Sequence, residues 1–138
     1  MYRNKLLENK SSRNVIISSL QHTLFERSYE TEQHAQRLTE LVFKMGRVIG
    51  LAANQMNDLA LLATLHDVGK MAIPEEILSK AGLLSPEEWK IMKNHPIIGH
   101  RIIQAIPDLT HIAEAILAHH ERWDGTGYPQ GLKQEEIP

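Results

Sequence analysis

The stretch Leu59-Ala-Leu-Leu-Ala-Thr-Leu-His-Asp-Val-Gly-Lys70 decides the fold. No charged residue occurs from Leu59 to Leu65, and the composition favours helix, so the sequence predicts a helix that is buried on most sides. The helix runs into His66 and Asp67, an imidazole and a carboxylate that are costly to bury without a compensating partner. A divalent metal ion would compensate both. A hydrogen-bonded pair at the negative end of the helix dipole would do so too, and the dipeptide alone does not separate these two readings.

The composition narrows the classes of protein that the chain can belong to. Its 138 residues are enough for one domain with a core, and 42% hydrophobic and 23% charged residues are typical of a globular protein. A net charge of −2 argues against a duplex nucleic-acid binder. The lack of cysteine excludes disulfides and thiolate metal sites. No apolar run approaches the roughly 20 residues of a membrane span, and no signal peptide is visible, so we expect a cytoplasmic protein.

The periodicity of the apolar residues predicts an all-α fold. Apolar residues recur at helical spacing in most of the chain, and no segment alternates as a half-buried strand would. The clearest start signal is Ser85-Pro-Glu-Glu88, a capping box with proline at the first helical position. We expect residues 1–28 to form a connecting helix and residues 29–138 to form one domain. Within them we expect helices over about residues 1–27, 30–49 and 109–120, and helices that begin near residues 54, 74, 85 and 94.

The placement of the histidines suggests a metal site. Five of the eight histidines fall at the ends or on the inward faces of expected helices, and two acidic residues accompany them. Glu30 and His34 are four residues apart, so we expect both on the core-facing side of one helix. An all-nitrogen-and-oxygen donor set suits Fe, Mn, Ni, Co or Zn, and Asp67 could bridge two ions, as two-metal hydrolases require. Each residue alone also fits an ordinary role, such as a core-edge imidazole, a helix-end imidazole or a solvated acid. The histidines concerned are His34, His66, His95, His119 and His120.

Four motifs, in order along the chain, together resemble the HD-GYP family, a branch of the HD metal-dependent phosphohydrolases. The resemblance covers residues from about Tyr29 to Pro138 and implies an all-α, HD-domain-like bundle with metal ligands at the inner faces and ends of core helices. It further implies hydrolysis of cyclic di-GMP, a bacterial second messenger, to pGpG and GMP. The motifs are His66-Asp67-Val68-Gly69-Lys70, Asn94-His95-Pro96, His119-His120-Glu121 and Trp123-Asp-Gly-Thr-Gly-Tyr-Pro129.

The resemblance also assigns roles to individual residues. Asp67 would lie between two metal ions and Lys70 would reach a phosphate, so both are candidate catalytic residues. Lys70, Gly127, Tyr128 and Pro129 would contact the substrate. Two or three divalent ions are implied, most readily Fe or Mn, with Ni, Co or Zn as alternatives. The implied metal ligands are Glu30, His34, His66, Asp67, His95, His119 and His120.

The chain departs from the family pattern at its C-terminus. Family members carry a further metal-binding Asp and basic residues after the Gly-Tyr-Pro loop, and this chain ends before reaching either. We therefore expect a truncated domain with weak or no activity of its own, and uncovered apolar surface that favours a homodimer. Met1-Tyr-Arg-Asn-Lys5 resembles the end of a GGDEF domain, which suggests such a domain upstream and as a partner. Two rival functions stay open: a signalling module that binds nucleotide or a GGDEF partner without turnover, and an HD phosphohydrolase acting on another nucleotide.

Overall fold

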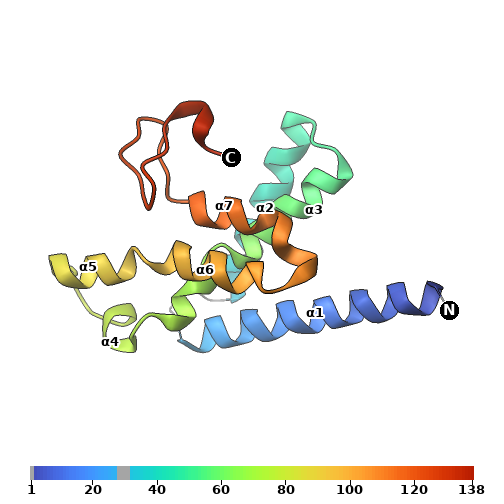
Figure 1. Ribbon diagram of the computed structural model, residues 1–138, viewed down its shortest axis with the longest axis horizontal. Coiled ribbons are helices and arrows are strands. Elements are labelled where there is room, and N and C mark those ends of the chain that lie inside the picture. The colour runs from blue at the N-terminus through green and yellow to red at the C-terminus, as the bar shows by residue number, and fades with distance from the viewer. Residues whose placement is uncertain (1, 28–31) are drawn as a thin grey trace.

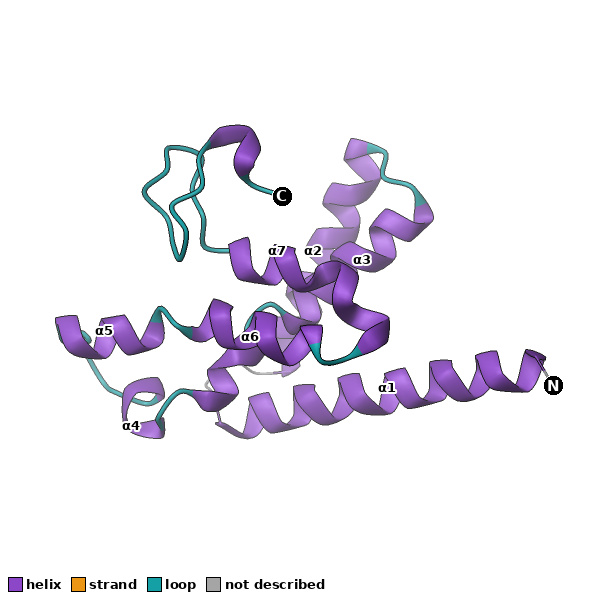
Figure 2. Cartoon of the chain, viewed as in Figure 1, coloured by secondary structure: helices purple, strands orange, loops and turns teal. Residues whose placement is uncertain are grey.

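The structure is a computed structural model that describes residues 2–27 and 32–138. Every regular element in these ranges is a helix, as Figures 1 and 2 show, which confirms the all-α prediction. The elements are α1 (Tyr2–Arg27), α2 (Glu32–Ile49), α3 (Ala53–Leu65), the 3₁₀ helix η1 (Val68–Ala72), α4 (Glu75–Leu78), α5 (Pro86–Met92), α6 (His95–Gln104), the 3₁₀ helix η2 (Pro107–Ile112), α7 (Ala113–Ala118) and the 3₁₀ helix η3 (Gln134–Glu136).

The core lies where α3, η1, α6, η2 and α7 meet. The C-terminal half of α1 packs against it, because Leu24 is buried and Ile17 and Leu20 contact the core side chains. The N-terminal half of α1 extends away from the other helices (Figure 1). The buried residues of the core are Leu65, Val68, Ile103, Leu109, Ile112, Ala113 and Ile116.

The helix expected over residues 109–120 is divided in two, which corrects that prediction. Its first part belongs to η2 and only Ala113–Ala118 is α-helical. In a 3₁₀ helix the side chains at positions i and i+3 lie on the same side. Leu109 and Ile112 have that spacing and are 0% and 3% exposed, so the tighter helix turns both into the core. The two histidines that follow therefore lie just after the end of a short helix, α7.

Gly69 lets η1 lie directly against α6. A Cβ atom at this position would stand 1.8 Å from the carbonyl oxygen of His95 and 2.7 Å from the backbone nitrogen of Gly99. Only glycine allows two backbones to approach so closely. Because Asp67 immediately precedes η1 and His95 begins α6, this contact brings the carboxylate and the imidazole to the same place.

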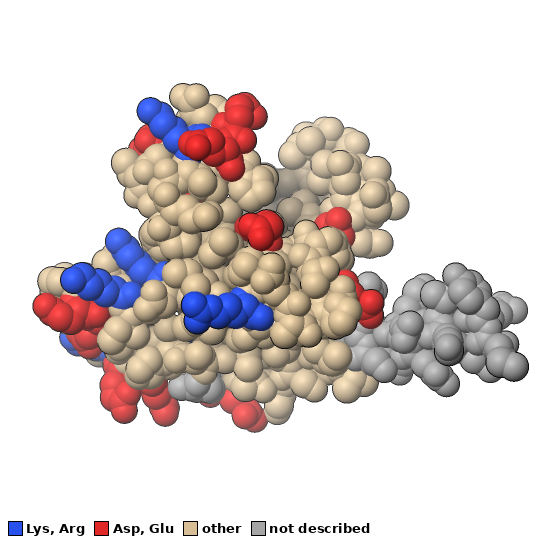
Figure 3. Space-filling view, viewed as in Figure 1, with Lys and Arg blue, Asp and Glu red and all other residues tan. Residues whose placement is uncertain are grey.

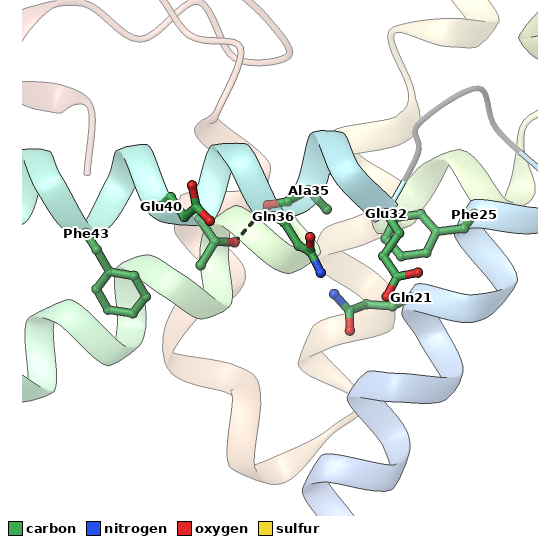
Figure 4. A pocket seen from close by; sticks show the side chains of 8 residues that line it. Gln21, Phe25, Glu32, Ala35, Gln36, Glu40 and Phe43 are labelled. Atoms are coloured by element: carbon green, nitrogen blue, oxygen red, sulfur yellow. Dashed lines mark hydrogen bonds between the residues drawn. The ribbon is translucent and has the colours of Figure 1, made fainter.

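A separate groove lies between the C-terminal half of α1 and α2. Gln21 and Phe25 of α1 lie near Glu32 and Gln36 of α2, and Phe43 lies farther along α2 (Figure 4). None of its lining residues also lines the pockets beside the site described below.

Charged side chains of both signs are interspersed on the face shown in Figure 3, where blue and red groups adjoin over α5 at the left. This face carries no large patch of a single charge, in keeping with the near-neutral composition. Among the described residues, no helix combines the length and the apolar character needed to cross a bilayer.

Candidate metal centre

The carboxylate of Asp67 is the central group of the site. It lies between α3 and η1, and its side chain is 9% exposed. Oδ1 lies 3.2 Å from Nε2 of His95 and 3.5 Å from Nε2 of His119. Oδ2 lies 3.1 Å from Nε2 of His66 and 3.2 Å from Nζ of Lys70. The two oxygens thus face two different groups of nitrogen atoms, one of which includes the ammonium of Lys70.

The backbone orients three of the imidazoles in the same way. In His66, His95 and His119, Nδ1 lies within hydrogen-bond distance of the carbonyl oxygen three residues earlier in the chain. A carbonyl oxygen only accepts, so Nδ1 carries a proton, and in the neutral form of each ring an Nε2 lone pair is directed toward Asp67. The distances are 2.9 Å for His66, 2.8 Å for His95 and 2.6 Å for His119.

The nitrogen atoms crowd together in a way that suits a cation. Nε2 of His95 lies 3.3 Å from Nε2 of His119 and 3.2 Å from Nε2 of His120. When both rings are neutral, the tautomer set by the backbone leaves no hydrogen between His95 and His119, so two lone pairs face each other. Ligand atoms of these three histidines and Asp67 all lie within 4.8 Å of one another. A nitrogen-and-oxygen donor set of this kind fits a divalent metal ion.

Burial keeps the remaining imidazole neutral. Desolvation, followed by the neighbouring imidazoles of His119 and His95, lowers the pKa of His120 to about 4. The ring is therefore uncharged at neutral pH, the form in which an imidazole binds metal. Burial and the negative charge of Asp67 raise the pKa of Tyr128, so that its phenol stays protonated and able to donate.

The Gly-Tyr-Pro loop closes one side of the centre. The Tyr128 ring stacks on His120, with centroids 4.9 Å apart and planes inclined by 15°. The backbone N–H of Tyr128 donates to the carbonyl oxygen of His120 over 3.3 Å. Gly127 allows this contact, because a Cβ there would lie 2.4 Å from the same carbonyl oxygen. Pro129 follows through a cis peptide bond.

The carboxylate of Glu121 holds the end of this loop. Oε1 accepts a hydrogen bond from the backbone N–H of Gln130 over 2.8 Å, and Oε2 accepts one from Leu132 over 2.9 Å. Glu121 follows His119 and His120 directly, so the motif joins the loop to the histidine pair. The sequence alone does not reveal this role of Glu121, because its hydrogen-bond partners depend on the path of the loop.

Most of the expected site residues come together. His66, Asp67, Lys70, His95, His119 and His120 form the centre, and Gly127 and Tyr128 line its edge. Pro129 follows them in the loop.

Two of the expected metal ligands, His34 and Glu30, are not among the described residues that the structure brings together. The expectation that His34 lies against the core is wrong, since the residue is exposed on α2. Leu38 and Val42, which follow at four-residue intervals, line an open pocket beside the centre instead of packing into the core. Glu30 lies outside the described residues.

Two residues next to the centre are not among those expected from the sequence: Trp89 in α5 and Lys93, which directly follows α5. Trp89 and Lys93 line the same pocket as His120 and Tyr128. The signal was present in the capping box at Ser85, which sets the start of the helix and hence places Trp89 and Lys93, four residues apart, on one face.

Comparison with known proteins agrees with this geometry. The model of the HD domain family matches residues 18–138. A cyclic di-GMP phosphodiesterase of Thermotoga maritima is 46% identical over 114 residues, which are 81% of this chain and 31% of the relative. The 3'3'-cGAMP-specific phosphodiesterase 2 of Vibrio cholerae is 36% identical over 137 residues, 98% of this chain and 26% of the relative. The cyclic di-GMP phosphodiesterase response regulator RpfG of Xanthomonas campestris pv. campestris is 35% identical over 124 residues, 88% of this chain and 33% of the relative.

The chain belongs to the HD domain family, and the resemblance to its HD-GYP branch is confirmed. It spans about a quarter to a third of the length of these curated relatives.

Proposed function

We propose that this chain carries the metal centre of a phosphodiesterase that hydrolyses 3'3' cyclic dinucleotides, with cyclic di-GMP as the first candidate substrate. The observation that carries the proposal is the buried Asp67 carboxylate, whose two oxygens face separate groups of nitrogen atoms. A two-metal site of this kind is suited to phosphoester hydrolysis. The names of the relatives support a cyclic dinucleotide as the substrate class.

The proposed cofactor is two or three divalent ions, Fe or Mn first, with Ni, Co or Zn as alternatives. When bound, such ions neutralise phosphate oxygens and lower the pKa of a water molecule. The proposed ligands are Glu30, His34, His66, Asp67, His95, His119 and His120.

The residues of the chain supply orientation and charge for the reaction. Three backbone carbonyls hold the imidazoles of His66, His95 and His119 with Nε2 toward the centre. Lys70 donates to Asp67 from 3.2 Å, so its ammonium both fixes the carboxylate and stands where it can meet a phosphate as a point charge.

The loop completes the proposed substrate site. The protonated phenol of Tyr128 can donate to the substrate, while Gly127 and Pro129 border it. Hydrolysis of the two phosphodiester bonds in turn would yield pGpG and then GMP.

We also propose a neighbouring domain, an oligomeric state and a cellular location for this chain. The resemblance of residues 1–5 to the end of a GGDEF domain supports residues 1–28 as a connecting helix and a GGDEF domain as a partner. Exposed apolar side chains on α2, such as Val48 at 88% exposure, support a homodimer. A cytoplasmic location follows from the proposed substrate, a bacterial second messenger.

The relatives also favour a second substrate, 3'3'-cGAMP, which differs from cyclic di-GMP in one base. The test of the function is therefore a measurement of metal content and of turnover with both dinucleotides. We expect protein purified anaerobically to contain at least one transition-metal ion per chain by elemental analysis, and to hydrolyse one or both substrates at least slowly, as chromatography can measure.

The decisive variant is Asp67→Ala, which we expect to lose metal and turnover together. Asp108→Ala, which removes an exposed carboxylate of η2, is the matched control and should keep both. Hydrolysis that persists in Asp67→Ala, or a native protein free of transition metal, would contradict the proposal. Metal and nucleotide binding without turnover would favour a signalling module instead.

A further inference from the structure

A second pocket adjoins the metal centre on the side of α5. It has a volume of about 530 Å³ and lies between α5 and the Gly-Tyr-Pro loop. His119 and His120 form part of its wall, so the pocket opens onto the centre. Its volume is within the range of small-molecule sites, roughly 300–1,000 Å³.

Three aromatic rings lead outward from the centre along this pocket. Tyr128 stacks on His120, and the indole of Trp89 meets Tyr128 edge-on, with centroids 6.4 Å apart and planes inclined by 73°. Trp89 remains 43% exposed although it lies in an ordered helix. Part of the Trp89 side chain beside the metal centre is therefore accessible to a ligand.

A positive charge lies over the same rings. Nζ of Lys93 is 5.2 Å from the centroid of Tyr128 and 5.8 Å from that of Trp89. Both distances are within the range of a cation–π contact, so the rings help to hold the ammonium at the pocket. Arg122 also lines the pocket and adds a second cation.

The capping box at the start of α5 engages the carboxylate of Glu88, the acidic residue next to Trp89 in the chain. Ser85 Oγ accepts from the backbone N–H of Glu88 over 3.1 Å, and the Glu88 carboxylate accepts from the N–H of Ser85 over 2.9 Å. The same carboxylate pairs with Lys80. Glu88 is thus engaged at the start of the helix by groups other than Lys93.

We propose that Trp89, Lys93 and Tyr128 form a subsite for the second nucleotide of the substrate. This inference rests on the proposed function. A cyclic dinucleotide has two phosphates and two bases, and when one phosphate lies at the metal centre the other half must extend to one side. The pocket offers an indole face for the second base and an ammonium for the second phosphate. Trp89 and Lys93 are then residues that set affinity for the dinucleotide.

The subsite has a consequence for specificity. Stacking on an aromatic ring tolerates any base, because every base has a π face. The subsite therefore accepts guanine and adenine alike, and the loss of Trp89 weakens the binding of cyclic di-GMP and of 3'3'-cGAMP by the same factor.

The kinetic test compares two kinds of substrate. Cyclic di-GMP has bases and a second phosphate, whereas bis(p-nitrophenyl) phosphate is a phosphodiester with neither. We expect Trp89→Ala to raise KM for cyclic di-GMP by about 10-fold, since one base–aromatic stack is lost. Metal content should not change, and KM for bis(p-nitrophenyl) phosphate should rise by much less than KM for cyclic di-GMP. Trp89→Phe retains a ring and should restore most of the affinity.

The role of the Lys93 charge is tested with the same two substrates. Lys93→Ala should raise KM for cyclic di-GMP several-fold and reduce its dependence on salt. Two changes on α5 that do not line the pocket, Lys90→Ala and Ile91→Ala, are matched controls and should leave both substrates unaffected. An unchanged KM for cyclic di-GMP in Trp89→Ala, or an equal loss with both substrates, would overturn the subsite.

A binding measurement keeps the test independent of turnover. The chain has two tryptophans, so Trp123→Phe leaves Trp89 as the sole indole fluorophore. Saturable quenching of that fluorescence by cyclic di-GMP is expected even if the protein proves to hydrolyse nothing. If metal and hydrolysis are absent but quenching is seen, the proposed function fails and the subsite stands. If hydrolysis occurs without quenching, the subsite fails alone.

Discussion

The helices around the metal centre and helix α2 differ in how their apolar side chains are used. Ile103 and Ile116, in α6 and α7, are fully buried, whereas Met45 and Val48 in α2 are 54% and 88% exposed. Every described residue of the centre comes from a segment next to the buried core, and the exposed His34 comes from α2. The difference indicates that core packing, more than the presence of donor side chains, brings ligand atoms together.

The largest loss of stability is expected at Gly69, where the backbones of η1 and α6 are in contact. Gly69→Ala forces η1 away from α6, because the new methyl group would overlap the carbonyl oxygen of His95. We expect a loss of about 3 kcal/mol or more in the free energy of unfolding, together with loss of metal. Urea denaturation and elemental analysis measure the two quantities.

Gly50→Ala at the end of α2 is the matched control for that change. Gly50 has a φ of 83° and no atom within 4 Å of a new Cβ, so only backbone strain opposes the substitution. That strain costs about 1 kcal/mol, and metal content should be retained. Similar losses in the two variants would remove the distinction between the regions.

The next largest loss of stability is expected when a single core side chain is shortened. Ile116→Ala leaves a cavity beneath the histidine pair, with an expected loss of about 2–5 kcal/mol. Val48→Ala, on the exposed face of α2, should change stability by less than about 0.5 kcal/mol. A large loss in Val48→Ala would show that α2 is covered in solution, and its dependence on protein concentration would reveal a homodimer.

A smaller effect is expected at the loop. Glu121→Gln keeps one carbonyl acceptor but loses the charge that strengthens the bonds to Gln130 and Leu132. We expect a loss of about 1 kcal/mol in stability and a raised KM for cyclic di-GMP, with metal content unchanged. Loss of metal in Glu121→Gln would mean that the loop helps to hold the centre itself.

A further effect is a pH dependence of the stability of the metal-free protein. The pKa of His120 is lowered to about 4 in the folded state, so the unfolded state binds more protons between that pH and the ordinary pKa of histidine, about 6.5. Stability in chelator should therefore decline as the pH falls through this window. Thermal denaturation at several pH values measures it, and His120→Asn should show a shallower slope. An identical slope in the variant would contradict this origin.

The sequence predicted the fold class well for a physical reason. Helix formation depends on local periodicity and capping, and the start of α5 at Ser85 and the end of α2 at Gly50 follow from local rules. The split between η2 and α7 was not predictable in this way, because it depends on which side chains the core can take up. The histidine motifs are also local features of the sequence. Their order and spacing identified the donor residues of the candidate centre but not the positions of these residues in space.

By itself, the sequence determined that this protein is helical, that it has nitrogen and oxygen donors but no thiolates, and which motifs carry them. These are properties of residue type and of short-range spacing. Tertiary structure alone decided that the two oxygens of Asp67 face different partners, that His34 is exposed, and that Trp89 and Lys93 adjoin His120. Contacts of this kind join residues distant in the chain, and their geometry depends on how closely the helices pack, as at Gly69.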